Sequence, residues 1–115
     1  MTDVINPVDI EQAIRTCSDR IHKGVKVVTD AERESREKGR AYDRAFARAY
    51  LAASDGPAHE RKYRAELATA AERDARDVAE VAFKFAERTA RAVEAELRAW
   101  QSVGASVRAM YGSQQ

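Results

Sequence analysis

The chain has 115 residues, of which 44% are hydrophobic and 34% are charged, and its formal net charge is +1. This length corresponds to about one domain with a single core. The small net charge excludes a globally basic, histone-like protein but leaves room for local basic patches. Alanine supplies much of the hydrophobic fraction, and it favours helices while burying little area. The composition therefore predicts narrow helix-on-helix seams rather than a thick core.

The first predicted helix spans about residues 7–53. Asn6 and Pro7 suit the N-cap and the first helical position, and Asp9 suits the positive end of the helix dipole. An apolar register then continues at alternating spacings of three and four residues. It comprises Ile10, Ile14, Cys17, Ile21, Val28, Ala31, Ser35, Tyr42, Ala45, Ala49 and Ala52.

Two signals break up this pattern along the chain. A break in the first helix near 24–29 is left open, because Gly24 precedes the β-branched residues Val25, Val27, Val28 and Thr29. The turn at 54–57 is the stronger signal, because Gly56 can end one helix and Pro57 can begin the next.

The second predicted helix spans about 57–103, with a tail at 104–115. Its stripe has near-helical spacing and comprises Tyr63, Leu67, Ala70, Val78, Val81, Phe85, Thr89, Val93, Leu97, Trp100, Val103 and Val107. The short connection makes the two helices antiparallel neighbours. We therefore expect one all-α domain over 1–115, a long coiled-coil-like antiparallel hairpin with a C-terminal helical tail. Because large apolar residues are few, we also expect a homo-oligomer.

No constellation of residues predicts an enzyme, a metal or a cofactor. Cys17 is a lone thiol on the apolar register and is expected to be a small core residue. His22 and His59 lie on different helices, without metal-ligand spacing. The carboxylates have basic neighbours at helical spacing, which is typical of exposed helix faces. The pairs with the acid on the favourable, N-terminal side are Glu72-Arg76, Glu80-Lys84, Glu87-Arg91 and Glu94-Arg98.

The expected compartment is the cytoplasm. The chain has no apolar run long enough to span a membrane, and it opens with an acidic segment unlike a signal peptide. We therefore expect no membrane association.

Basic residues concentrate around the turn. Between residues 36 and 64 there are eight basic and four acidic residues. Guanidinium groups recurring every four residues can neutralise phosphates, and interleaved aromatic rings can stack on bases, a combination used to bind single strands. The alternative is that the aromatic rings lie in the hairpin seam and the arginines only solvate the opposite face. The candidate nucleic-acid-binding residues are Arg40, Arg44, Arg48, Tyr50, Arg61, Lys62, Tyr63 and Arg64.

The segment from Trp100 to Tyr111 has a single charge, unlike the helix before it. Such a segment either closes the open end of the hairpin or forms an interface between subunits, because Trp, Tyr and Met anchor such contacts. The candidate oligomer-interface residues are Trp100, Val103, Val107, Met110 and Tyr111.

Three stretches resemble the small α-helical recombination-mediator proteins of tailed phages: Arg48 to Ala53 before Gly56, Glu60-Arg61-Lys62, and Trp100 to Arg108. The resemblance covers roughly residues 40–110. It implies a ring-forming protein of the host cytoplasm that binds single-stranded DNA and helps to load a recombinase. It also implies DNA contacts in the basic segment and subunit contacts in the tail. The alternative function is a helical protein-protein interaction module, an adaptor or inhibitor that does not bind nucleic acid.

Overall fold

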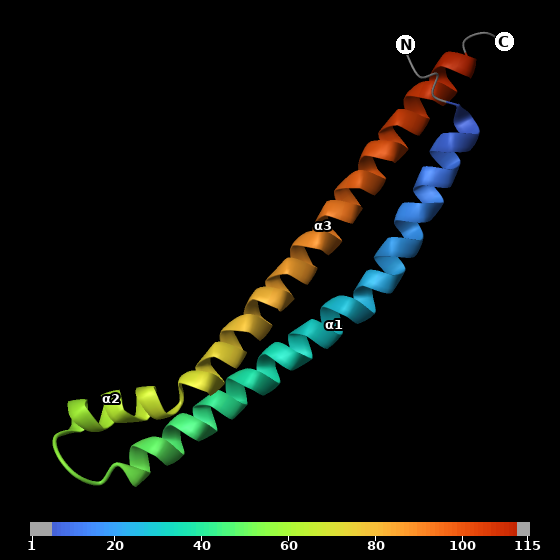
Figure 1. Cartoon of the computed structure of the whole chain (residues 1–115). Helices are drawn as coiled ribbons and strands as arrows, with labels where there is room; N and C mark the ends of the chain where they lie inside the picture. Colours follow the sequence, from blue (N-terminus) through green and yellow to red (C-terminus); the bar gives the residue numbers. More distant parts are fainter. Residues whose placement is uncertain (1–5, 113–115) are drawn as a thin grey trace. The chain divides into compact units, whose positions relative to one another are not determined.

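The computed structural model describes residues 6–112, which form α1 (Pro7–Ala52), α2 (Ala58–Ala68) and α3 (Ala70–Gly112) (Figure 1). The expected all-α fold is therefore confirmed. None of the described helices is long and apolar enough to cross a membrane. The described residues divide into two compact units, which we call the terminal unit (6–27 and 87–112) and the turn-side unit (28–86).

The start of α1 follows the predicted capping. The Asn6 side-chain oxygen accepts a hydrogen bond from the Val8 backbone N–H at 2.8 Å, and the Asn6 carbonyl accepts one from the Ile10 N–H at 3.2 Å. These bonds satisfy groups that a helix start otherwise leaves without partners. The helix then runs uninterrupted through 24–29, so the possible break there is not present.

The connection after α1 lies where the turn was predicted. Gly56 adopts a φ of +87°, a left-handed conformation that residues with a Cβ rarely adopt. Pro57 then sets the start of α2, and its carbonyl accepts a hydrogen bond from the Arg61 N–H at 3.1 Å. A glycine followed by a proline thus reverses the chain within a few residues.

The single second helix predicted for 57–103 is wrong, because Thr69 separates α2 from α3. Thr69 has φ −114° and ψ 21°, outside the helical region. Its buried hydroxyl donates a hydrogen bond to the Ala65 carbonyl at 2.7 Å, and its backbone N–H donates to the Ala65 and Glu66 carbonyls. The threonine therefore satisfies the end of α2 through its own side chain. Further along, α3 continues through Gly104, and the expected tail is helical to Gly112; residues 113–115 lie outside the described range.

The terminal unit pairs the first half of α1 with the second half of α3 in antiparallel orientation (Figure 1). Ile10 is buried against Gly104, where an added Cβ would lie 3.3 Å from the Ile10 side chain. Ten residues further along α1, Arg20 forms an ion pair with Glu96 of α3 at 3.0 Å. Cys17 lies between these contacts along α1 and is only 1% exposed, as expected for a core residue.

The turn-side unit contains the second half of α1, all of α2 and the start of α3. Arg76 of α3 lies over the Tyr42 ring, and Arg61 of α2 lies over the Tyr50 ring. The contact with the higher residue number in α1, at Tyr50, has the lower residue number in its partner, at Arg61. The helices therefore run antiparallel here too. The buried residues of α2, the junction and α3 in this unit are small: Ala65, Thr69, Ala79 and Ala86.

The seam predicted for the second helix is therefore wrong in its first half. Val78, Val81 and Phe85 were placed on the seam, but about 70% of each is exposed. Tyr63 and Leu67 are exposed as well. From Val93 onward the prediction agrees with the structure, because Val93 is buried and Leu97, Trp100, Val103 and Val107 are half-buried. In α1 the predicted register is buried or half-buried except at Ala52.

Candidate nucleic-acid interface

The outer face of α1 in the turn-side unit carries a row of arginines that we call the basic strip: Arg33, Arg36, Arg40, Arg44 and Arg48. All five are exposed. Spacings of three and four residues keep them on one side of the helix, with about 6 Å of rise between residues four apart. Half-buried Tyr42, Ala45 and Ala49 mark the opposite side of α1, so the basic strip points away from the seam.

The two ends of the basic strip differ in their ion pairing. Arg33 pairs with Asp30 at 3.3 Å, and Arg36 pairs with Glu32 at 3.8 Å. Among residues 6–112, no carboxylate forms an ion pair with Arg40, Arg44 or Arg48. The strip therefore presents three consecutive guanidinium groups whose hydrogen-bond donors face solvent.

A shallow groove of about 270 Å³ lies at the first part of the basic strip. Arg33, Arg36 and Arg40 line it together with Thr29 and Glu32. Arg33 and Arg36 were not among the sequence-based candidates. They could have been found by extending the helical spacing of the arginine ladder toward the N-terminus.

Tyr50 and Arg61, two of the predicted nucleic-acid-binding residues, contact each other instead. The Arg61 guanidinium carbon lies 5.2 Å from the centre of the Tyr50 ring. On the α1 side, Tyr50 stacks with Phe46 at a centroid distance of 6.4 Å. Both rings are half-buried, and Arg61 Nε is buried without a hydrogen-bond partner. This arrangement agrees with the alternative that the aromatic row belongs to the seam, and it leaves Tyr50 little free ring surface for a base.

The remaining predicted residues lie on α2, away from the basic strip. Lys62, Tyr63 and Arg64 are all exposed. Tyr63 lies two residues before buried Ala65, which places it about 200° around the helix from the seam. The Arg64 guanidinium donates a hydrogen bond to the Asp55 carbonyl. The eight predicted residues thus do not form one surface, because α1 and α2 direct their exposed groups to different sides of the turn-side unit.

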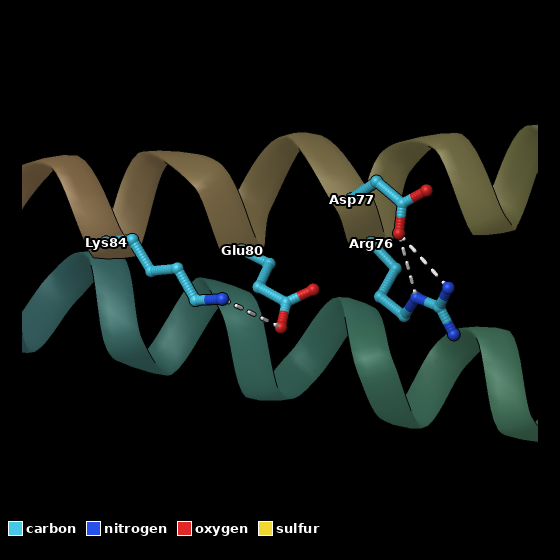
Figure 2. Close-up of polar contacts among 4 residues, drawn as sticks. All are labelled: Arg76, Asp77, Glu80 and Lys84. Atoms are coloured by element: carbon cyan, nitrogen blue, oxygen red, sulfur yellow. Dashed lines mark hydrogen bonds and ion pairs between the residues drawn. The ribbon is translucent and has the colours of Figure 1, made fainter.

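Two ion pairs lie along the first part of α3 (Figure 2). Glu80 and Lys84 form one of the predicted pairs at 3.8 Å. The predicted pair Glu72-Arg76 is wrong, because Arg76 pairs with Asp77 and a buried oxygen of Glu72 has no hydrogen-bond partner. Arg76 reaches its neighbour Asp77 at 3.1 Å, while its guanidinium carbon lies 4.5 Å from the centre of the Tyr42 ring. These exposed pairs contribute little to stability. Arg76 and Lys84 are thus matched by carboxylates of their own helix, unlike Arg40, Arg44 and Arg48 of α1.

The predicted oligomer-interface residues lie in the terminal unit and differ in exposure. Trp100, Val103 and Val107 are half-buried, whereas Met110 and Tyr111 are 65% and 54% exposed. An open groove of about 350 Å³ lies beside them, lined by Pro7, Ile10, Glu11, Ile14, Gly104, Val107 and Arg108.

Within the described residues, no group of three or more His, Cys, Asp or Glu side chains could hold a metal ion. The comparisons with known proteins add no relative: no protein-family model matches the chain, and neither the curated proteins nor the solved structures contain a match. The feature that the geometry leaves for a functional interpretation is the basic strip, with its three exposed arginines that have no ion pair among the described residues.

Proposed function

We propose that this protein is a non-enzymatic accessory factor that binds single-stranded nucleic acid, of the kind that phage recombination and replication use. The contact is made by the basic strip to the phosphate backbone. The observation that carries the proposal is the run of Arg40, Arg44 and Arg48, which are exposed and without an ion pair among the described residues. In the resemblance to phage mediators, a recombinase is the protein partner and the site of action is the host cytoplasm.

The charge arrangement favours a phosphate chain over a protein partner. Unpaired arginines at regular helical spacing repel each other by a few tenths of a kcal/mol per pair unless an anion lies among them. A flexible polyanion relieves this repulsion along the whole row and releases its condensed counterions on binding. Bidentate arginine–phosphate hydrogen bonds add to this electrostatic term.

Base stacking by the two predicted tyrosines, Tyr50 and Tyr63, is not part of this proposal. Tyr50 is covered by Arg61, so its ring is not proposed as a platform for bases. Tyr63 is exposed, but it lies away from the basic strip. We therefore propose binding through phosphates, with little preference for base sequence.

The test is fluorescence anisotropy of a labelled single-stranded oligonucleotide titrated with the full chain at several salt concentrations. The informative variant replaces Arg40, Arg44 and Arg48 together with glutamine. Its matched control replaces Arg88, Arg91 and Arg98, which are exposed arginines of the terminal unit, so that the net charge changes equally. Circular dichroism of each variant verifies that the helices remain folded.

Binding by the unsubstituted chain should weaken steeply with salt. The strip variant should lose affinity. Its plot of log K against log salt should become shallower by roughly 2 units of slope, about 0.7 for each of three lost phosphate contacts. The control variant should keep nearly all of the affinity. Equal losses in the two variants would show a general charge effect, and the absence of binding at low salt would refute the proposal.

A second candidate function, a helical protein-protein interaction module, is favoured by a different observation. Leu51 and Leu67 are each 79% exposed, on α1 and α2 respectively. Exposed leucines of this kind can anchor a partner helix through burial that barely responds to salt. The same salt series separates the two functions, because only the phosphate contacts release counterions.

A further inference from the structure

The first part of α3 carries an outer apolar face that the hairpin does not use. We define it as Val78, Val81 and Phe85, with Ala75 and Ala82 along one edge. All five are exposed, including about 70% of Val78 and Phe85. The spacing of three and then four residues between the large members is that of a coiled-coil seam.

This face is separate from the seam inside the turn-side unit. Ala79 and Ala86 are the buried positions of α3 there, one residue after Val78 and Phe85 respectively. One residue corresponds to a rotation of about 100° around the helix. The inner side of α3 in this unit therefore carries buried Ala79 and Ala86 with half-buried Phe83 between them, whereas Val78, Val81 and Phe85 are exposed. Large apolar side chains gain most from burial, so this outer face has burial still to gain.

We propose that a second copy of this chain covers the outer apolar face, so that two α3 helices pack antiparallel across a twofold axis near Val81 and Ala82. The charges beside the face argue for this occupant. Asp77 and Lys84 are seven residues apart and therefore share one edge of the face, opposite the alanine edge. Both are more than half exposed, and within the helix they pair with Arg76 and Glu80 respectively.

In an antiparallel pair, like edges meet. Asp77 of each copy then faces Lys84 of the other, and the alanine edges meet each other and allow close approach. In a parallel pair, the charged edge would lie against the alanine edge and its charges would have no partner across the interface. The order of charges along α3 thus fits one orientation of a second copy.

The proposed contact spans only about two turns of helix, so it buries less than the roughly 800 Å² per partner of a standard interface. Association is therefore reversible and depends on concentration. Sedimentation velocity of the full chain over a wide concentration range should show a monomer–dimer equilibrium. The substitution Phe85→Ser should raise the dimer dissociation constant about tenfold or more, because it truncates the largest apolar side chain of the face in both copies, at a cost of about 1.4 kcal/mol or more.

The matched control is Val8→Ser, which removes a large apolar side chain of similar exposure, 66% against 70% for Phe85, from the start of α1 and should leave the dissociation constant unchanged. A chain that stays monomeric at every concentration would overturn the proposal. So would a dimer that Phe85→Ser and Val8→Ser weaken equally. Circular dichroism of both variants separates a lost interface from a lost fold.

Cysteine crosslinking tests the orientation in a Cys17→Ala background. Near the axis, Val81→Cys should form a disulfide between copies under mild oxidation. Val78→Cys should not, because its counterpart is displaced by seven residues, or about 10 Å, and a disulfide needs Cα atoms within about 7 Å. Equal crosslinking at both positions would indicate a parallel pair, and no crosslinking at Val81→Cys would place the interface elsewhere; either result overturns the antiparallel arrangement.

Discussion

Replacing Ala79 with leucine tests whether small residues form the seam of the turn-side unit. Ala79 is 7% exposed on α3, so the larger side chain has to enter a filled contact between helices. Overpacking of this kind costs about 1–3 kcal/mol, whereas the intrinsic helix propensities of alanine and leucine are nearly equal. The expected fall in the melting temperature is about 4 °C or more for each kcal/mol.

The assay is thermal and urea unfolding followed by far-UV circular dichroism. The control is Ala47→Leu, the same substitution at an exposed position of α1 in the same unit. It should change the free energy of unfolding by no more than about 0.5 kcal/mol. If Ala79→Leu were neutral while Ala47→Leu destabilised the protein, the reasoning about which faces meet would be refuted.

Three further predictions concern single positions. Gly56→Ala should destabilise the protein by about 1–2 kcal/mol because of its positive φ, whereas Gly39→Ala, where an added Cβ meets nothing within 4 Å, should stabilise it by roughly 0.5–1 kcal/mol in the same melts. The Cys17 thiol should react with a thiol reagent only after denaturant is added, and fast reaction of the native protein would contradict its burial. Thr69→Val should cost about 1 kcal/mol in urea unfolding by removing the hydroxyl bond to Ala65, and an unchanged midpoint would show that this bond contributes nothing.

The first helix was predictable because its signals agree with one another. Asn6 and Pro7 mark the start, Gly56 and Pro57 mark the turn, and the apolar register of α1 repeats at heptad spacing between them. Gly24 and the β-branched residues after it weaken the helix only slightly, since propensity differences are below about 1 kcal/mol per residue. Packing against α3 in the terminal unit overrides so small a preference.

The second helix was harder to predict because alanine occurs on all of its faces. Ala65, Ala79 and Ala86 are buried in its seam, and no periodicity of alanine alone distinguishes them from exposed alanines. The large residues Val78 and Phe85 form a clear stripe, and that stripe was assigned to the hairpin seam. A stripe shows that a face is apolar, but the partner helix decides whether it is buried within the chain.

The break at Thr69 also has no strong sequence signal. Neither glycine nor proline is present there, and threonine within a helical pattern usually remains helical. The break depends on the Thr69 hydroxyl and backbone N–H turning back to Ala65, which requires a buried position. Only the packed structure shows that position to be buried.

For the candidate site, sequence reasoning found the exposed arginines but not their grouping. The spacing of Arg40, Arg44 and Arg48 fixes one helix face whatever the partner, so their exposure was predictable. Whether Tyr50 faces solvent or the seam depends on Arg61, which belongs to another helix. The exposure of the arginines could therefore be predicted from α1 alone, whereas the availability of the Tyr50 ring could not, because it depends on a contact with α2.

The two proposals for the turn-side unit make a joint prediction. The basic strip lies on the side of α1 away from the seam and the outer apolar face lies on α3, so one surface does not block the other. A dimer carries two basic strips. A long oligonucleotide bound to one strip can bind the second strip intramolecularly, which raises its overall affinity. Phe85→Ser should therefore weaken binding to long single strands and leave binding to strands that reach one strip unchanged, as measured by anisotropy. Equal affinity of the variant and the unsubstituted chain for the long strand would show that the copies bind independently.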